Sequence, residues 1–161
     1  MSEPPDNPTV LGATVLSNYA YTDGVGLLKE LPRVCTTPKV RREISEGVDR
    51  YPYLQEALDK IGGEGDISVV ELTEKEEERA ERHLDCLDPG ESEALAVVKE
   101  RDGTIVTDDG KARSVARQEE VPVTGSIGIL VAKVESDRVD EEEAERWTPK
   151  VGRRNRIQGS L

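Results

Sequence analysis

Short aliphatic runs that alternate with longer amphipathic segments are the feature that most constrains this chain. Four runs are rich in β-branched residues and have the length of buried strands: Thr9–Leu11, Arg33–Thr36, Ile67–Leu72 and Thr104–Thr107. The segments between them carry apolar residues at helical spacing. This alternation predicts an α/β fold with a mainly parallel sheet.

The predicted helices fill the spaces between the runs. Thr73 and Glu76 have the spacing of a capping box, which places a helix start there, and Pro38 suits the first turn of another helix. A short strand over Val121–Val123 is expected at a sheet edge, because Pro122 has no N–H to donate. The expected helices cover residues 15–20, 25–31, 38–48, 53–61, 73–84, a segment from 88, 111–117 and 127–134.

Length and charge suggest one domain with an unusual surface. The chain has 161 residues, 34 acidic against 22 basic, and a net charge of −12. Such a charge ordinarily opposes binding to nucleic acid. The spread of acidic residues, with Arg more frequent than Lys, also resembles proteins of salt-loving archaea, in which strong salt screens the repulsion. Because aromatic residues are scarce, the core is expected to be aliphatic.

Three segments are expected along the chain: a polar N-terminal segment over 1–8, a domain over 9–136, and an acidic helix with a basic tail over 137–161. The tail from Trp147 onwards contains no acidic residue. It is interpreted as a solvated terminus or, alternatively, as an arm that contacts phosphate or a partner. Its basic residues are Lys150, Arg153, Arg154 and Arg156.

The sequence also carries expectations about location. No apolar run is long enough for a membrane span, and the polar N-terminus is unlike a signal peptide. Cys35 and Cys86 show no metal-ligand spacing, so both are expected to be buried thiols in a reducing cytoplasm. His83 has no partner at ligand spacing and is expected to be solvated.

Acidic residues gather near the ends of the predicted strands. Asp108 and Asp109 follow the fourth strand, Glu91 and Glu93 open the helix before it, and Glu43 lies on the helix after the second strand. In a parallel α/β sheet, ligands bind beyond the carboxyl ends of the strands. Carboxylates there suit Mg²⁺ or Mn²⁺. Each residue also has a structural explanation, as a helix cap or a solvated side chain.

A resemblance adds to this interpretation. The segments ATVLSNYA, TPKVRREISEGV, PGESEALAVV, IVTDDGKAR and VPVTGSIGILVAK, which span residues 9–134 in order, resemble the PIN-domain family. More narrowly, they resemble an uncharacterised prokaryotic branch related to VapC toxins. The resemblance implies a three-layer α/β/α domain with four or five strands. It also implies a Mg²⁺- or Mn²⁺-dependent endoribonuclease that cleaves RNA, often tRNA or rRNA.

The resemblance assigns roles to individual residues. Glu43, Glu93 and Asp109 match the catalytic metal-binding acids, and Glu91 and Asp108 are further candidates for metal ligands. Substrate phosphate would be met by Lys111 and Arg113, with Ser126 as a small hydroxyl residue at the rim. For Lys111 and Arg113 a solvated helix face is an equal alternative. The resemblance further implies a homodimer and a small antitoxin partner.

One residue departs from the family pattern. The family's first catalytic Asp closes the first strand, where this chain has Gly12. Glycine has no side chain to bind a metal, and loss of one ligand weakens both ion affinity and water positioning. The chain is therefore a natural inactive relative or an active toxin that has acquired a substitution. As the alternative to a nuclease, it is a catalytically inactive domain that binds RNA or protein.

Overall fold

Five short parallel strands form the centre of the computed structural model, which describes residues 6–136. The strands lie in the order β3-β2-β1-β4-β5, and every pair is parallel. The prediction of a parallel sheet with four or five strands is confirmed. The expected acidic helix and basic tail over 137–161 lie outside the described residues. The strands are β1 (Thr9–Leu11), β2 (Val34–Thr36), β3 (Ser68–Val69), β4 (Thr104–Val106) and β5 (Val123–Thr124).

The register of the sheet brings the carboxyl ends of its central strands to one level. Thr9 of β1 pairs with both Val34 of β2 and Thr104 of β4. Strands of three residues that start level also end level, so the residues that follow β1, β2 and β4 emerge side by side. Gly12 and Thr107 are two of these residues, and they define the edge at which the candidate site lies.

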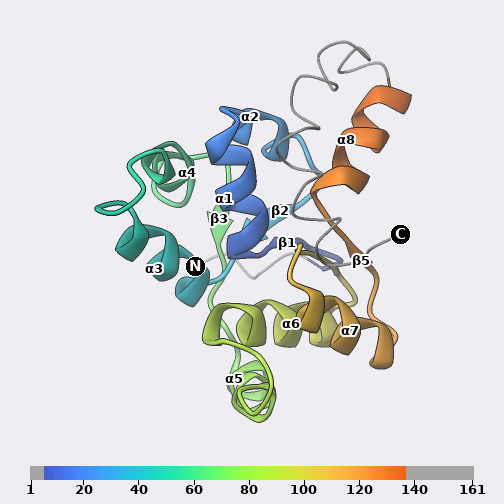
Figure 1. The fold of residues 1–161 in the computed structure, drawn as a ribbon. Coiled ribbons are helices and arrows are strands. Elements are labelled where there is room, and N and C mark those ends of the chain that lie inside the picture. The colour runs from blue at the N-terminus through green and yellow to red at the C-terminus, as the bar shows by residue number, and fades with distance from the viewer. Residues whose placement is uncertain (1–5, 137–161) are drawn as a thin grey trace.

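Helices cover both faces of the sheet, as Figure 1 shows. Successive strand residues face opposite sides, so Leu11 packs in one core and Val10 in the other. The three-layer α/β/α prediction is thus confirmed. The core that holds Leu11 is built with α1 (Ala13–Tyr21), α2 (Val25–Leu28), α3 (Pro38–Gly47), α4 (Leu54–Lys60) and α8 (Ser126–Glu135). The other is built with α6 (Pro89–Arg101) and α7 (Gly110–Gln118), and α5 (Glu74–His83) packs against α6.

Helix α6 owes its position to an apolar surface that runs around the whole helix. Residues 90–98 are all buried, because α6 contacts α3, α5, α7 and two strands. A helix that is apolar all round is stable only when it is enclosed in this way. The helix therefore carries the carboxylates of Glu91, in its first turn, and Glu93 into the interior, where the candidate site lies.

Several element boundaries differ from the predictions. Helix α2 ends at Leu28 instead of residue 31, because the N–H groups of Glu30 and Leu31 bond three residues back, to the Leu27 and Leu28 carbonyls, in tighter turns than those of an α-helix. Strand β3 has two residues in place of six, with an additional bridge between Ile61 and Ile67. Strand β5 begins after Pro122 and lies at the sheet edge, as predicted. The capping box of Thr73 and Glu76 is present.

Two predictions about single residues are wrong. His83 is buried, and its Nε2 lies 2.7 Å from Oε2 of Glu119, which follows α7 and is remote in sequence. Cys86 is exposed, whereas Cys35 is buried as expected. Burial raises the pKa of the Cys35 thiol to about 12. Within residues 6–136, none of the helices combines the length and apolar character that a bilayer crossing requires.

Candidate active site at the carboxyl edge of the sheet

Gly12 directly follows the central strand β1 and faces a carboxylate. Its φ of −87° suits any residue, and its N–H donates to the Val106 carbonyl at 2.8 Å. A Cβ at this position would lie 2.9 Å from Oε1 of Glu91 and 3.3 Å from the Val106 oxygen. A side chain on residue 12 would therefore point at Glu91, and the end of the Glu91 side chain would have to shift to admit it.

Glu91 lies in the first turn of α6 and carries its carboxylate inward. Asp88, the N-cap of this helix, accepts a hydrogen bond from the Glu91 N–H at 2.9 Å. Glu91 is buried, with a relative exposure of 3%. Its Oε1 accepts a hydrogen bond from Oγ1 of Thr107 at 3.2 Å, whereas Oε2 has no partner among the described residues. A buried carboxylate oxygen without a donor is costly, which marks this group as a candidate ligand.

The electrostatics of the edge oppose negative charge on Glu91. Burial raises its pKa to about 8, and the charges of Asp88, Asp109 and Glu43 act in the same direction. Burial and the charge of Asp88 likewise raise the pKa of Glu43. Glu91 thus lies within the electrostatic influence of three other carboxylates, and a bound cation would relieve the repulsion that they exert on it.

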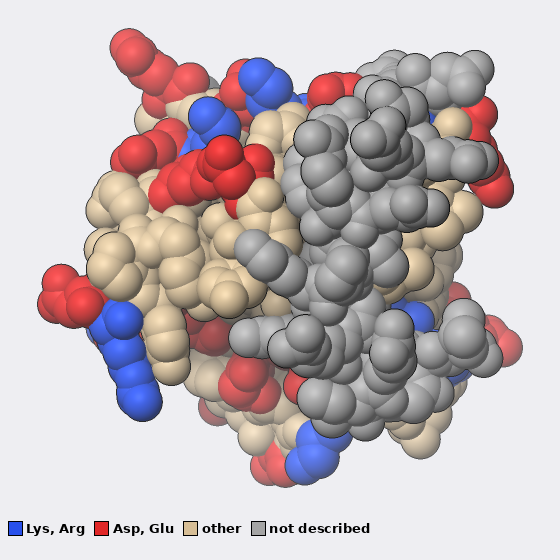
Figure 2. Space-filling model, turned by 45° about the horizontal axis from the view of Figure 1, so that its top comes forward, with Lys and Arg blue, Asp and Glu red and all other residues tan. Residues whose placement is uncertain are grey.

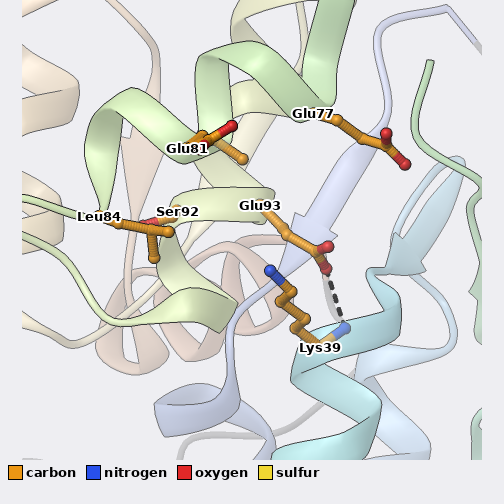
Figure 3. A pocket seen from close by; sticks show the side chains of 7 residues that line it. Lys39, Glu77, Glu81, Leu84, Ser92 and Glu93 are labelled. Carbon is orange, nitrogen blue, oxygen red and sulfur yellow. Dashed lines mark hydrogen bonds between the residues drawn. The ribbon is translucent and has the colours of Figure 1, made fainter. Parts of the chain in front are cut away.

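Glu43 and Glu93 join the N-terminal ends of two helices reciprocally. Oε1 of Glu43 on α3 accepts a hydrogen bond from the Gly90 N–H on α6 at 2.9 Å. Oε1 of Glu93 on α6 accepts one from the Lys39 N–H on α3, also at 2.9 Å, as Figure 3 shows. Each carboxylate thus satisfies an N–H group in the first turn of the other helix.

Glu93 points away from Glu91. Residues two apart on a helix do not share a face, and Glu93 lines a separate pocket of about 410 Å³ between the starts of α3 and α6 and the side of α5 (Figure 3). Glu91 instead faces Gly12. The structure therefore does not bring the two glutamates together. The residues that line the pocket are Lys39, Glu77, Ala80, Glu81, Leu84, Ser92 and Glu93.

Asp108 is buried and fully engaged. Its Oδ1 accepts a hydrogen bond from the Ser126 N–H at 2.8 Å, and its Oδ2 accepts one from Nδ2 of Asn18 at 2.6 Å. The Ser126 hydroxyl also donates to Oδ2. Ser126 is therefore buried instead of standing at the rim, and Asp108 ties β4 to α1 and α8.

Asp109 is the N-cap of α7, and its Oδ2 accepts a hydrogen bond from the Ala112 N–H at 2.9 Å. Arg113, one turn along, donates from Nη1 to the Thr107 carbonyl at 3.1 Å, while Lys111 is exposed. A Cβ on Gly125 would lie 2.5 Å from Oδ1 of Asp108 and 2.6 Å from Nη1 of Arg113. The glycine is thus what allows these two side chains to approach the same place.

Some residues of the edge were not predicted as site residues. Thr107 contacts Glu91, the Asp109 N–H bonds to the Thr107 hydroxyl at 3.0 Å, and the Thr14 hydroxyl accepts from the Asp108 N–H at 3.0 Å. Hydroxyl side chains near the ends of strands are so common that the sequence does not single out Thr14 and Thr107 as site residues. Asp88 was recognisable only as a helix cap. Among the residues that the structure describes, no three His, Cys, Asp or Glu side chains are placed to hold a metal ion together.

The sheet order and the helices on both faces define a three-layer α/β/α domain with carboxylates at the carboxyl edge of a parallel sheet. A model of the DUF3368 family, described as a PIN domain, matches residues 8–146. The chain therefore belongs to the DUF3368 family of PIN domains. PIN domains generally use divalent metal ions and commonly bind RNA. No curated protein matches the chain.

Proposed function

We propose that this chain is a metal-dependent endoribonuclease of the VapC-like toxin type, whose hydrolysis of RNA is impaired by Gly12. One observation carries the proposal: the buried Glu91 carboxylate, with a hydrogen-bond-free oxygen, faces the position at which the strand end lacks a side chain. An aspartate at position 12 would lie against Glu91, so a cation between the two would be bound by both.

The residues of the edge fit a divalent cation incompletely. Glu91 would contact Mg²⁺ or Mn²⁺ through the oxygen that has no hydrogen-bond partner, and Glu43 and Asp109 are the further candidate ligands, because the charges of both raise the pKa of Glu91. Such an ion activates water and stabilises the leaving oxygen in phosphodiester hydrolysis. Without a carboxylate at position 12, the described residues do not assemble three acidic ligands in one place. The proposed consequence is weak ion binding and slow cleavage.

The other residues predicted for the site would position the edge or bind substrate. Asp108 orients the start of α8 through Ser126, and Glu93 orients α3, so both would position the edge. Arg113 and the exposed Lys111 would meet substrate phosphate. The proposal includes tRNA or rRNA as the substrate, an antitoxin protein as a partner, a homodimer and a cytoplasmic location in a halophilic archaeon.

Restoring the missing carboxylate tests the proposal. Gly12→Asp supplies a ligand, whereas Gly12→Asn has the same shape and no charge, and is the matched control. We expect Mn²⁺-dependent cleavage of total RNA by G12D, little by the original chain and G12N, and loss of the gained activity in G12D/E91Q. Circular dichroism and urea denaturation establish that each variant is folded.

A second candidate function rests on the same glycine. A PIN domain that lacks the first acid is also suited to binding RNA or protein without cleavage. If folded G12D cleaves no RNA with Mn²⁺, the nuclease proposal is wrong and the binding function replaces it. Equal cleavage by G12D and G12N would instead show that the charge at position 12 is irrelevant.

A further inference from the structure

Three tyrosine side chains lie together on the surface, with acidic residues close to them in the chain. Tyr21 ends α1, and Tyr51 and Tyr53 lie between α3 and α4. The ring centroids of Tyr21 and Tyr53 are 5.1 Å apart, and those of Tyr51 and Tyr53 are 5.9 Å apart. Tyr21 is 56% exposed and Tyr51 is 44% exposed. We refer to the three rings and their acidic neighbours as the tyrosine surface, and these neighbours are Asp23, Glu46, Asp49 and Glu56.

Two carboxyl groups of the tyrosine surface repel each other. Glu56 on α4 shares a hydrogen bond with Asp23, which follows α1. Burial raises the pKa of the Glu56 carboxyl, and the hydrogen bond with Asp23 and the charge of Asp23 raise it further, whereas the charge of Lys60 lowers it. A cationic side chain that docked against this pair would relieve the repulsion between the two groups.

The surface already holds one guanidinium group. The guanidinium carbon of Arg50 lies 5.5 Å from the centre of the Tyr51 ring, within the range of a cation–π contact. Figure 2 turns forward the top of Figure 1, where α2 and α4 lie, and shows acidic side chains at the border of a broad uncharged area. Because an arginine both stacks on aromatic faces and pairs with carboxylates, the tyrosine surface offers an incoming arginine both contacts.

One segment of the chain has the complementary charge. Residues 147–161, which lie outside the described residues, contain three arginines, one lysine and no acidic residue, although the whole chain has a net charge of −12. The segment also begins with Trp147, the one tryptophan of the sequence. We refer to residues 147–161 as the basic segment. A second copy of the whole domain is a poorer occupant of the surface, because the two copies would carry the same strong negative charge.

Helix α8, the last described element, lies in the same layer as the tyrosine surface. It shares one hydrophobic core with α1, α2 and α4. Nζ of Lys133 in its last turn lies 3.5 Å from Oε1 of Glu30, which closely follows α2. The eleven residues from Ser136 to Trp147 span up to roughly 36–40 Å when extended, so the basic segment can reach the tyrosine surface. The acidic pocket beside α5 instead belongs to the other helix layer (Figure 1).

We propose that the basic segment docks on the tyrosine surface of its own molecule. Its arginines pair with the carboxylates of the surface and stack on the exposed tyrosine rings, in the way that Arg50 already meets Tyr51. While the segment is docked, its arginines are withheld from other anions, including phosphate groups. The proposal concerns contacts within one chain and does not depend on whether the domain cleaves RNA.

Quenching of Trp147 fluorescence by acrylamide tests the proposal in the full chain, because no other tryptophan contributes. The salt concentration is the lowest at which circular dichroism shows a folded domain, since salt screens exposed ion pairs. We expect Trp147 to be quenched less in the folded chain than in urea.

Two pairs of variants connect this protection to the tyrosine surface. Glu46→Gln/Asp49→Asn is expected to lower the ratio of docked to undocked segment roughly twofold to thirtyfold, the range for loss of two exposed ion pairs. Glu77→Gln/Glu81→Gln removes the same charge from α5, away from the surface, and is expected to leave the quenching unchanged. Tyr51→Ala is expected to increase the quenching, whereas Tyr51→Phe, which keeps the ring, is not.

Three results would overturn the proposal. Quenching of Trp147 in the folded original chain as strong as in urea would show that the basic segment is not docked. Equal increases in quenching in the E46Q/D49N and E77Q/E81Q variants would show that the net charge of the domain matters and the tyrosine surface does not. Protection of Trp147 that disappears on dilution of the protein would assign the basic segment to a second copy of the chain.

Discussion

Replacing the buried Glu91 by glutamine is expected to change how the stability of the domain depends on pH. Glutamine has the same shape, and its side-chain oxygen can still accept the hydrogen bond from Thr107. Its amide group occupies the place of the Oε2 atom that has no hydrogen-bond partner. Any cost of burying that amide is the same at every pH, so it does not affect a comparison between two pH values.

The magnitude follows from the pKa of Glu91. Burial, with the charges of Asp88 and Asp109, raises this pKa from 4.5 to about 8 in the folded domain. Below pH 4.5 both folded and unfolded chains hold the proton, so Glu91 costs no stability there. As the pH rises from 4.5 to 8, the unfolded chain loses the proton first, and the free energy of unfolding falls by roughly 5 kcal/mol at 1.36 kcal/mol per pKa unit. That loss is comparable with the whole stability of a small domain.

Urea denaturation at pH 5 and pH 8, without divalent cations, measures the effect. Other groups, including Glu43, also titrate, so the informative quantity is the pH-dependent loss in the original chain minus the loss in E91Q. We expect the original chain to lose several kcal/mol more than E91Q. Parallel pH profiles of the two proteins would refute the reasoning, because Glu91 would then titrate at its ordinary pKa.

Four further predictions concern ions, hydrogen bonds and thiols. Mn²⁺ at one hundred times its dissociation constant is expected to raise the free energy of unfolding at pH 8 by about 2.7 kcal/mol, and to have no such effect on the Glu91→Gln variant, as measured by urea denaturation. Asp108→Asn is expected to cost roughly 3 kcal/mol in the same assay, because an amide cannot accept all three hydrogen bonds; a loss below 1 kcal/mol would contradict the geometry. Glu93→Ala is expected to cost about 1–2 kcal/mol by leaving an N–H of α3 without its acceptor, whereas Glu93→Gln keeps the acceptor and stays close to the original stability. With a thiol reagent, Cys86 alone is expected to react in the folded protein and Cys35 only after unfolding in urea; reaction of both thiols at equal rates in the folded protein would contradict the burial of Cys35.

Local patterns were enough to predict much of the fold. Runs of branched aliphatic residues mark the strands, because such residues pack well on a pleated surface. The aliphatic residues of α6, which follow Asp88, are buried on all sides of the helix, as the composition of this segment suggests. The roles of Asp109 and Thr73 as helix caps follow from spacings of three residues. The match between segment order and the PIN-domain family was also visible in the sequence, and the family model confirms the family.

The sequence by itself therefore determined the order of strands along the chain, the starts of the helices that have a capping residue or an N-terminal proline, and the presence of acidic residues at the carboxyl edge. Only the tertiary structure decided which acids face one another: Glu91 turns to Gly12 and Glu93 turns to α3, because the faces of α6 pack against different neighbours. The same holds for the burial of His83 against Glu119 and for the contact between the rings of Tyr21 and Tyr53. These contacts join residues that lie far apart in the chain, and no local propensity encodes such distances.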